Sequence, residues 1–365
     1  MVARDWQDQE LRERYPCVLY TRTQEERKTR NVWGFPVLDT LSEQRYYIPW
    51  LNQEKSLSWR AALSGPDTVD TSISKLLRQK ENSDVVFCID FENFDASISP
   101  RLISAAFSFI SSYFQRQYLN ELQALRDRFV TIPIFTPDGE FTGPHGVPSG
   151  SSFTNAVDSI VQFLVTNVAG HRCQIQGDDG VYVISNNDKD AILSECERLG
   201  LKVNESKSKT FKGRNAVYLQ RYYGEEYPSI DGSGLGGVYP IARALNRIKY
   251  LERWTDFERS EIGGSDFFSL RTIMILETCK HHPRFQQLVR YCQSLDKYGL
   301  KFSNQGVIAY SKMLEPRVKA GVFHGPNPSK GGIQNFWTVR VLRSCLLYTS
   351  PSPRDRTRSR MPSSA

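Results

Sequence analysis

The stretch QGDDG, at residues 176–180, lies between two short apolar runs, at residues 173–175 and 181–184. Two such runs around a centre of glycine and aspartate predict a tight β-hairpin. Its turn then carries Asp178 and Asp179 side by side. Because neighbouring like charges repel each other, a fold that holds these two together favours a bound cation. The hairpin is therefore the candidate metal site.

A second acidic motif follows the run DVVFCID at residues 84–90. Its apolar residues predict a buried strand that ends in Asp90, with Asp95 five positions later. Carboxylates at the ends of buried strands are where many α/β sites gather their catalytic groups. Ser99 and Pro100 then predict the N-cap and first position of a helix. The Asp-x4-Asp spacing alone is weak, since it often arises by chance.

The loop GVPSGSS, at residues 146–152, precedes an amphipathic helix through Val157, Ile160, Val161 and Leu164. Small residues let a nucleotide or a nucleic-acid backbone approach closely, and a helix start offers free amides. The alternative is an ordinary serine-rich capping loop. On the same helix, Thr154 and Asp158 are i, i+4 neighbours on one face.

One basic segment is a candidate phosphate contact, and a second is a candidate source of a proton donor. Residues 22–30 read RTQEERKTR, and Lys28 and Arg30 alternate so that both can point one way on a strand. The alternative is a solvated helix face of mixed charge. A lysine cluster that includes Lys207 and Lys209 is an ordinary solvated surface or a source of a proton donor.

Composition indicates a globular protein. The 365 residues are 39% hydrophobic and 12% aromatic, and no apolar run is long enough to span a membrane. The charged N-terminus lacks an apolar signal core. Seven cysteines without a Cys-x-x-Cys pair favour free thiols in a reducing compartment. The net charge of +7 is compatible with a polyanionic partner.

Residues 345–365, CLLYTSPSPRDRTRSRMPSSA, resemble one reading frame through a transposase-type sequencing adapter. We expect this segment to be non-native; the alternative is a genuine Ser/Arg-rich tail that binds nucleic acid. Removing its four arginines and one aspartate lowers the net charge from +7 to +4. On this interpretation the native chain continues past Ser344, and the protein is a fragment.

Other patterns predict a hairpin at residues 130–143, a short aromatic strand at 218–223 and a boundary at the glycine-rich stretch 232–237. Helical patterns occur at residues 119–129, 188–199, 239–254, 267–279, 285–295 and 307–314.

The motifs, taken in order, resemble motifs A, B and C of viral RNA-dependent RNA polymerases. Asp90-x4-Asp95 is similar to motif A, Gly146-x-Pro148-Ser149-Gly150 with Thr154 to motif B, and Gly177-Asp178-Asp179 to motif C. Residues 28–32 resemble motif F, residues 199–207 motif D and residues 218–224 motif E. The sequences of motifs B and C most resemble those of picobirnavirus polymerases, followed by those of partitivirus polymerases.

The resemblance implies a role for each motif residue. Asp90, Asp178 and Asp179 are implied to hold two Mg²⁺ or Mn²⁺ ions for nucleotidyl transfer. Lys28 and Arg30 are implied to bind the triphosphate, and Lys207, with Lys209 as its rival, to protonate the leaving pyrophosphate. The implied ribose readers are Asp95 with Thr154, Asn155 or Asp158, and Ser149-Gly150 is the implied mobile loop. Many such polymerases have Asn where this chain has Asp158, so the ribose contact stays open between Asn155 and Asp158.

The resemblance also implies an α+β right-hand fold, truncated at both ends. It has fingers, a palm whose antiparallel sheet is flanked by helices, and a helical thumb. The expected boundaries are partial fingers at 1–83, palm at 84–117, a fingers insertion at 118–145, palm at 146–224, a partial thumb at 225–344 and the non-native tail at 345–365.

The implied function is RNA synthesis on an RNA template for a viral, double-stranded RNA genome, in the host cytoplasm inside the virion. The partners are template and product RNA, nucleoside triphosphates and the viral capsid, with no membrane. We expect the fragment to keep an intact catalytic palm, which does not require that it polymerises alone. The alternatives are a non-catalytic RNA-binding or capsid-associated palm-fold protein and a reverse transcriptase. The first alternative predicts the loss of one of the three motif aspartates, and the second predicts Tyr-x in place of Gln176-Gly177.

Overall fold

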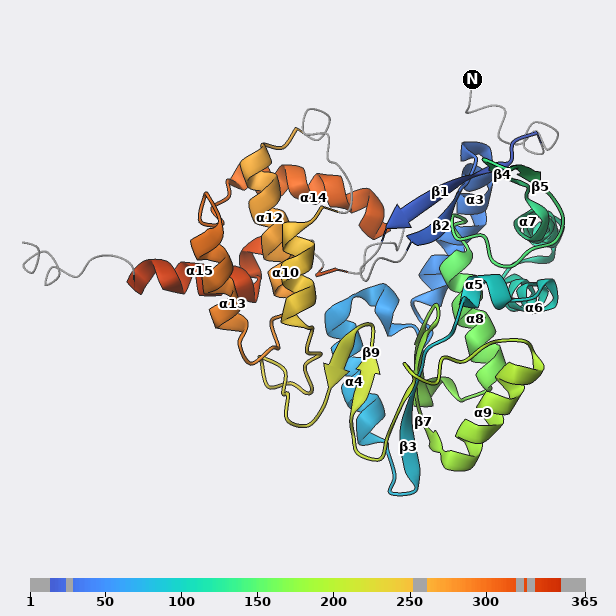
Figure 1. Ribbon diagram of the computed structural model, residues 1–365, viewed down its shortest axis with the longest axis horizontal. Coiled ribbons are helices and arrows are strands. Elements are labelled where there is room, and N and C mark those ends of the chain that lie inside the picture. Colours follow the sequence, from blue (N-terminus) through green and yellow to red (C-terminus); the bar gives the residue numbers. More distant parts are fainter. Residues whose placement is uncertain (1–13, 24–28, 252–260, 320–324, 327–331, 349–365) are drawn as a thin grey trace, which may run out of the picture. The chain divides into compact units, whose positions relative to one another are not determined.

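The computed structural model describes residues 14–23, 29–251, 261–319, 325–326 and 332–348 (Figure 1). The chain divides into two compact units, which are described separately below. The first unit comprises Met1–Ser64 and Thr71–Leu219, and the second comprises Gly65–Asp70 and Gln220–Ala365. The division after Leu219 lies five residues before the expected boundary at 224/225. No helix among the described residues has the length and apolar character needed to cross a membrane.

A four-stranded antiparallel sheet, in the order β6-β7-β3-β8, forms the centre of the first unit. β3 spans Asp84–Ile89, and all six of its residues are buried, as its apolar sequence predicts. The pairing of Ile89 with Gly180 places the end of β3 beside the start of β7. The predicted hairpin at residues 176–180 is confirmed, because β6 and β7 pair on either side of it. The other three strands are β6 (Cys173–Gln176), β7 (Asp179–Ser185) and β8 (Lys209–Phe211).

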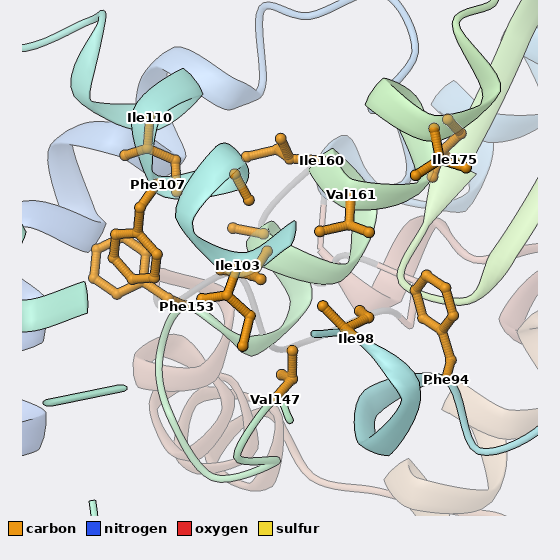
Figure 2. Close-up of a cluster of buried hydrophobic side chains, with 14 of the residues drawn as sticks. Phe94, Ile98, Ile103, Phe107, Ile110, Val147, Phe153, Ile160, Val161 and Ile175 are labelled. Atoms are coloured by element: carbon orange, nitrogen blue, oxygen red, sulfur yellow. The ribbon is translucent and has the colours of Figure 1, made fainter. Parts of the chain in front are cut away.

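Helices pack on this sheet and enclose the main core of the unit. α8 contacts β6 and α9, and α9 in turn contacts β3 and β7. Figure 2 shows part of this core, where Phe107, Phe153 and Ile160 lie among other buried side chains. The helices and helical turns of the unit are α3 (Val37–Glu54), η2 (Ala61–Ser64), α5 (Phe94–Ser97), α6 (Pro100–Ser111), η3 (Arg116–Tyr118), α7 (Leu119–Thr131), α8 (Thr154–Thr166), η4 (Gly170–Arg172) and α9 (Asn186–Arg198).

A second four-stranded sheet in the same unit has the strand order β2-β1-β4-β5. Its β4–β5 pair confirms the hairpin predicted at residues 130–143. β1 joins that hairpin to β2, which carries Arg30. The strands are β1 (Cys17–Thr23), β2 (Thr29–Gly34), β4 (Ile134–Thr136) and β5 (Gly139–Phe141).

The predicted start of α6 is confirmed. Ser99 is the N-cap, its hydroxyl accepts a hydrogen bond from the Leu102 amide, and Pro100 is the first helical residue. The helix predicted at residues 188–199 begins two residues earlier, since Ser185 forms a capping box with Asp188.

Two predictions are wrong in detail. Leu164 was placed on the buried face of α8, but its side chain is 40% exposed. The aromatic run 218–223 was predicted to be one strand, but it is split between β9 (Ala216–Tyr218) and β10 (Arg221–Tyr223). Leu219 and Gln220 between them have positive φ, which interrupts a strand. An aromatic run of this kind does not reveal such a break.

The second unit is largely helical and has its own hydrophobic core, built around Leu270, Ile273 and Val289. Asp70, in the first segment of the unit, accepts a hydrogen bond from the Tyr223 hydroxyl, and its Oδ2 lies 3.0 Å from His281 Nε2. The predicted helix 239–254 is shorter at both ends, since α10 begins at Ile241 and ends at Lys249, with Tyr250 as its extended C-cap; residues 252–260 lie outside the described residues. The helices are α10 (Ile241–Lys249), α12 (Gly264–Glu277), α13 (Phe285–Leu295), α14 (Asn304–Lys319), the turn η5 (Ile333–Asn335) and α15 (Trp337–Tyr348), while α4 (Pro66–Arg78) begins in this unit and ends in the first.

The contrast between Ile160 and Leu164 on α8 gives a test of the core. Ile160 is fully buried, so we expect Ile160→Ala to lower the free energy of unfolding by about 2–5 kcal/mol. Leu164→Ala, on the same helix, serves as the control and should cost well under half as much, because its side chain is 40% exposed. Chemical denaturation of both variants measures the difference, and equal losses would contradict this packing.

Candidate active site

The turn between β6 and β7 presents the two aspartates predicted from the sequence. Gln176 pairs with Asp179 across the hairpin, which leaves Gly177 and Asp178 as the turn. Gly177 has a φ of +64°, a left-handed conformation that glycine adopts without steric cost. Asp178 is exposed at the tip, and Asp179 is partly buried as the first residue of β7.

The third aspartate of the predicted metal site lies beside this turn. Asp90 directly follows β3, whose last residue pairs with Gly180. Burial, together with the charges of Asp178 and Asp90, raises the pKa of Asp179 to about 7. The structure therefore places the three carboxylates near one another, and a bound cation would relieve their repulsion.

Two further carboxylates face the same centre. Burial and the charge of Asp178 raise the pKa of Asp95. Burial, followed by the charges of Asp95 and Asp178, raises the pKa of Asp158 well above its usual range. The Asp158 side chain is buried on α8, and its Oδ1 has no hydrogen-bond partner in the described part of the chain. Asp95 and Asp158, two of the predicted ribose readers, thus lie near the turn, and their roles stay predictions.

Basic side chains counter this negative charge. Arg30 on β2 opposes the upward pKa shifts of Asp95 and Asp179, which places its charge near both. The Lys207 ammonium lies 3.7 Å from Asp90 Oδ1. Lys209 Nζ, by contrast, donates to the Ser206 carbonyl, so the geometry favours Lys207 between the two rivals. Lys28, the other predicted phosphate contact, lies outside the described residues.

The glycine-serine loop before α8 packs against β2. The Trp33 amide donates to Ser149 Oγ at 3.3 Å. A Cβ added at Gly150 would lie 1.7 Å from the Trp33 carbonyl oxygen, so this close approach requires glycine. The predicted mobility of Ser149-Gly150 is not tested by this contact and stays a prediction.

Thr154 and Asn155, at the start of α8, have different partners. The Thr154 hydroxyl donates to the carbonyl of Pro148 at 2.8 Å, so it holds the loop in this conformation. Asn155 Oδ1 accepts from Gln176 Nε2 at 3.0 Å, which ties the asparagine to the hairpin turn. Of the two residues, Asn155 is the one connected to the carboxylate centre.

Sequence reasoning missed two buried charged residues that support these motifs. Glu43 of α3 accepts hydrogen bonds from the Ser151 hydroxyl and the Ser152 amide, at 2.6 and 2.8 Å. Arg60, which lies just before η2, is fully buried and donates to Gln176 Oε1 and Asn155 Oδ1. Neither belongs to a recognisable motif, and an isolated charged residue in a mixed sequence gives no signal of burial.

The carboxylates suit a hard divalent cation. Carboxylate oxygen is the ligand type that Mg²⁺ and Mn²⁺ prefer. Among the described residues, no group of three or more histidine, cysteine, aspartate or glutamate side chains is placed so that it could hold a metal ion as it stands. The fit therefore rests on donor chemistry and on the mutual repulsion of Asp90, Asp178 and Asp179.

The order of these motifs matches a known family. The family model described as viral RNA-dependent RNA polymerase matches residues 8–234. The chain belongs to this family. A curated relative, the "Potential RNA-dependent RNA polymerase" of human picobirnavirus (strain Human/Thailand/Hy005102/-), is 28% identical over 347 residues. That match covers 87% of this chain and 62% of the relative.

A second curated relative is the RNA-directed RNA polymerase of Cryptosporidium parvum virus 1 (strain KSU-1). It is 30% identical over 175 residues, which cover 43% of this chain and 31% of the relative. The chain thus spans less than two thirds of the length of either curated relative.

Solved structures confirm the α+β polymerase fold. The crystal structure of the RNA-dependent RNA polymerase of a human picobirnavirus matches with a TM-score of 0.74 and 28% identity. This match covers 90% of the present chain and 65% of that chain. The polymerase of BmCPV at elongation state, at 13% identity and a TM-score of 0.54, shows the likeness of fold alone.

Glu43 predicts a pH dependence of stability. Burial raises the pKa of Glu43 from 4.5 to about 7. A carboxyl whose pKa is raised by folding stabilises the fold below its unfolded pKa, and that contribution is lost as the pH rises through the folded value. Between pH 4.5 and pH 7 we therefore expect the free energy of unfolding to fall by up to about 3 kcal/mol on account of this group.

Glu43→Gln cannot ionise and should remove that part of the pH dependence, as chemical denaturation at several pH values would measure. Glu140→Gln, at an exposed position of β5, is the control and should leave the profile unchanged. Parallel profiles for wild type and Glu43→Gln would contradict the assignment.

Proposed function

We propose that this protein carries out template-directed RNA synthesis, the transfer of a nucleotide from a nucleoside triphosphate to the 3′ end of an RNA strand. The observation that carries the proposal is the convergence of Asp90, Asp178 and Asp179 at one end of the central sheet. The family of the chain supports the same reaction.

Two Mg²⁺ or Mn²⁺ ions held by these three aspartates would lower the pKa of the attacking 3′-hydroxyl and stabilise the charge on the triphosphate. Arg30 binds the triphosphate and neutralises the charge that develops during transfer. Lys207, 3.7 Å from Asp90, donates a proton to the leaving pyrophosphate.

Asp95, Asn155 and Asp158 read the ribose 2′-hydroxyl, the group that separates RNA from DNA precursors. Asn155 is held against the hairpin turn through Gln176, so an amide is already fixed beside the carboxylates. Asp158 supplies a buried polar oxygen on the same helix. Together they place hydrogen-bonding groups on one side of the centre.

The proposal extends to the biological setting suggested by the picobirnavirus relative. The substrates are nucleoside triphosphates and template RNA, and the product replicates and transcribes a double-stranded viral RNA genome. The enzyme works in the host cytoplasm inside the virion, with the capsid as its protein partner.

Asp178→Asn tests the metal site. This change keeps the shape of the side chain but removes its charge, so Mn²⁺ binding and Mn²⁺-dependent incorporation of labelled nucleotides on a primed RNA template should each fall more than about 100-fold. Electron paramagnetic resonance measures the bound Mn²⁺. Asp190→Asn, at an exposed position of α9, is the matched control and should change neither readout. Equal Mn²⁺ binding and incorporation in wild type and Asp178→Asn would refute the metal assignment.

The role of Lys207 is tested against its neighbour Lys209. We expect Lys207→Gln to slow nucleotide incorporation on the order of 100-fold, the usual contribution of a general acid. Lys209→Gln should have a much smaller effect, because its ammonium donates to a backbone carbonyl. Single-turnover kinetics at saturating nucleotide measure the chemical step, and a larger loss in Lys209→Gln would reverse the assignment.

A further inference from the structure

Arg60 is a fully buried arginine that the polymerase motifs leave out. Its Nε lies 2.9 Å from Glu54 Oε1, and the two side chains are 0% and 1% exposed. Burying an ion pair costs desolvation energy, and apolar residues of similar size often give equal or greater stability. Packing alone therefore does not explain why a guanidinium occupies this position.

The rest of the guanidinium faces the candidate active site. Nη1 donates to Gln176 Oε1 at 2.8 Å and to the Ile175 carbonyl at 2.9 Å, at the end of β6. Nη2 donates to Asn155 Oδ1 at 2.7 Å, at the start of α8. The planar fork thus contacts, at the same time, the strand that leads into the turn and the helix that faces it.

Ser159 extends this contact to the turn itself. Its Oγ accepts from Arg60 Nη1 and from the Gly177 amide, at 2.5 and 2.8 Å. The same hydroxyl donates to the Asn155 carbonyl. One hydroxyl therefore separates the guanidinium from the backbone that carries Asp178.

The Arg60 backbone is fixed to the same strand. The Ile175 amide donates to the Trp59 carbonyl at 3.0 Å, and the Ala61 amide donates to Gln174 Oε1 at 3.2 Å. Residues 58–61 thus run along β6, which is the edge strand of the central sheet. Both the backbone and the side chain of Arg60 are therefore held in register with the hairpin.

We propose that Arg60 is a positioning residue that fixes the Gly177–Asp178 turn and the Asn155 amide relative to each other. The guanidinium holds Asn155 Oδ1, so the amide nitrogen Nδ2 of the same side chain faces Gly177. A Cβ built onto Gly177 would lie 3.3 Å from that nitrogen. The inference rests on the proposed function, since the geometry it preserves is that of the metal and ribose contacts.

The test must separate positioning from the stability of a buried ion pair. Arg60→Met leaves Glu54 buried without its partner, and we expect it to lower the melting temperature. Adding Glu54→Gln removes that lone charge, so the double variant E54Q/R60M should recover most of the melting temperature. We expect its affinity for Mn²⁺, measured by electron paramagnetic resonance, to stay about tenfold or more below wild type.

Two controls and a second test variant accompany this pair. Arg172→Met breaks an ion pair with Asp84 in the same sheet, so it should lower stability without weakening Mn²⁺ binding. Ser159→Ala removes only the linking hydroxyl and should weaken Mn²⁺ binding about tenfold. Ser108→Ala is its match, since that hydroxyl also donates to the carbonyl four residues earlier, but on an exposed face.

The outcomes are distinct. Wild-type Mn²⁺ affinity in E54Q/R60M or in Ser159→Ala would overturn the positioning role and leave Arg60 as a structural residue. If E54Q/R60M does not fold, the comparison of Ser159→Ala with Ser108→Ala decides the question. If Asp178→Asn binds Mn²⁺ as wild type does, it is the proposed metal site that fails, whatever the Arg60 variants show.

Discussion

The antiparallel pairing of β3 with β7 is the constraint on which the candidate site depends. Its register sets Ile89 opposite Gly180, so the residue after one strand meets the first residue of the other. Asp90 and Asp179 are therefore neighbours through backbone hydrogen bonds and not through any attraction of their own. A shift of one residue would turn every side chain of β3 to the opposite face of the sheet. Both faces of that strand are packed, so the shift would exchange side chains of different size between two close-packed surfaces, which opposes it.

This register brings the aspartates close together, and nearby basic side chains reduce the electrostatic repulsion between them. Arg30 and Lys207 bring positive charge to the centre from β2 and from the segment before β8. At Asp158 the repulsion remains: the side chain is buried on α8, and burial and the neighbouring carboxylates raise its pKa. A protonated carboxyl offers a donor as well as an acceptor, as an amide does. In its protonated form Asp158 would therefore offer the same kinds of hydrogen-bonding group as the asparagine that the resemblance leads us to expect there.

Much of this arrangement could be predicted from the sequence because local patterns determine it. The apolar run of β3, the Gly-Asp turn and the Ser99-Pro100 helix start are each read from a few adjacent residues, and the structure confirms all three. The break at Leu219 and Gln220 was missed, since non-glycine residues with positive φ have no local signature. Glu43 and Arg60 were missed for another reason. Their partners lie about a hundred residues away, and only the folded chain brings them together.

The two missed residues both support the start of one helix, α8. Glu43 belongs to α3 and holds Ser151 and Ser152, in the loop that leads into α8. Arg60 follows α3 and holds Asn155 and Ser159, on the first turns of α8. A single segment that carries none of the polymerase motifs thus orients the loop, the helix and the hairpin turn. Because catalysis in a site of charged ligands depends on positions held to a fraction of an ångström, the residues that hold the ligands matter as much as the ligands.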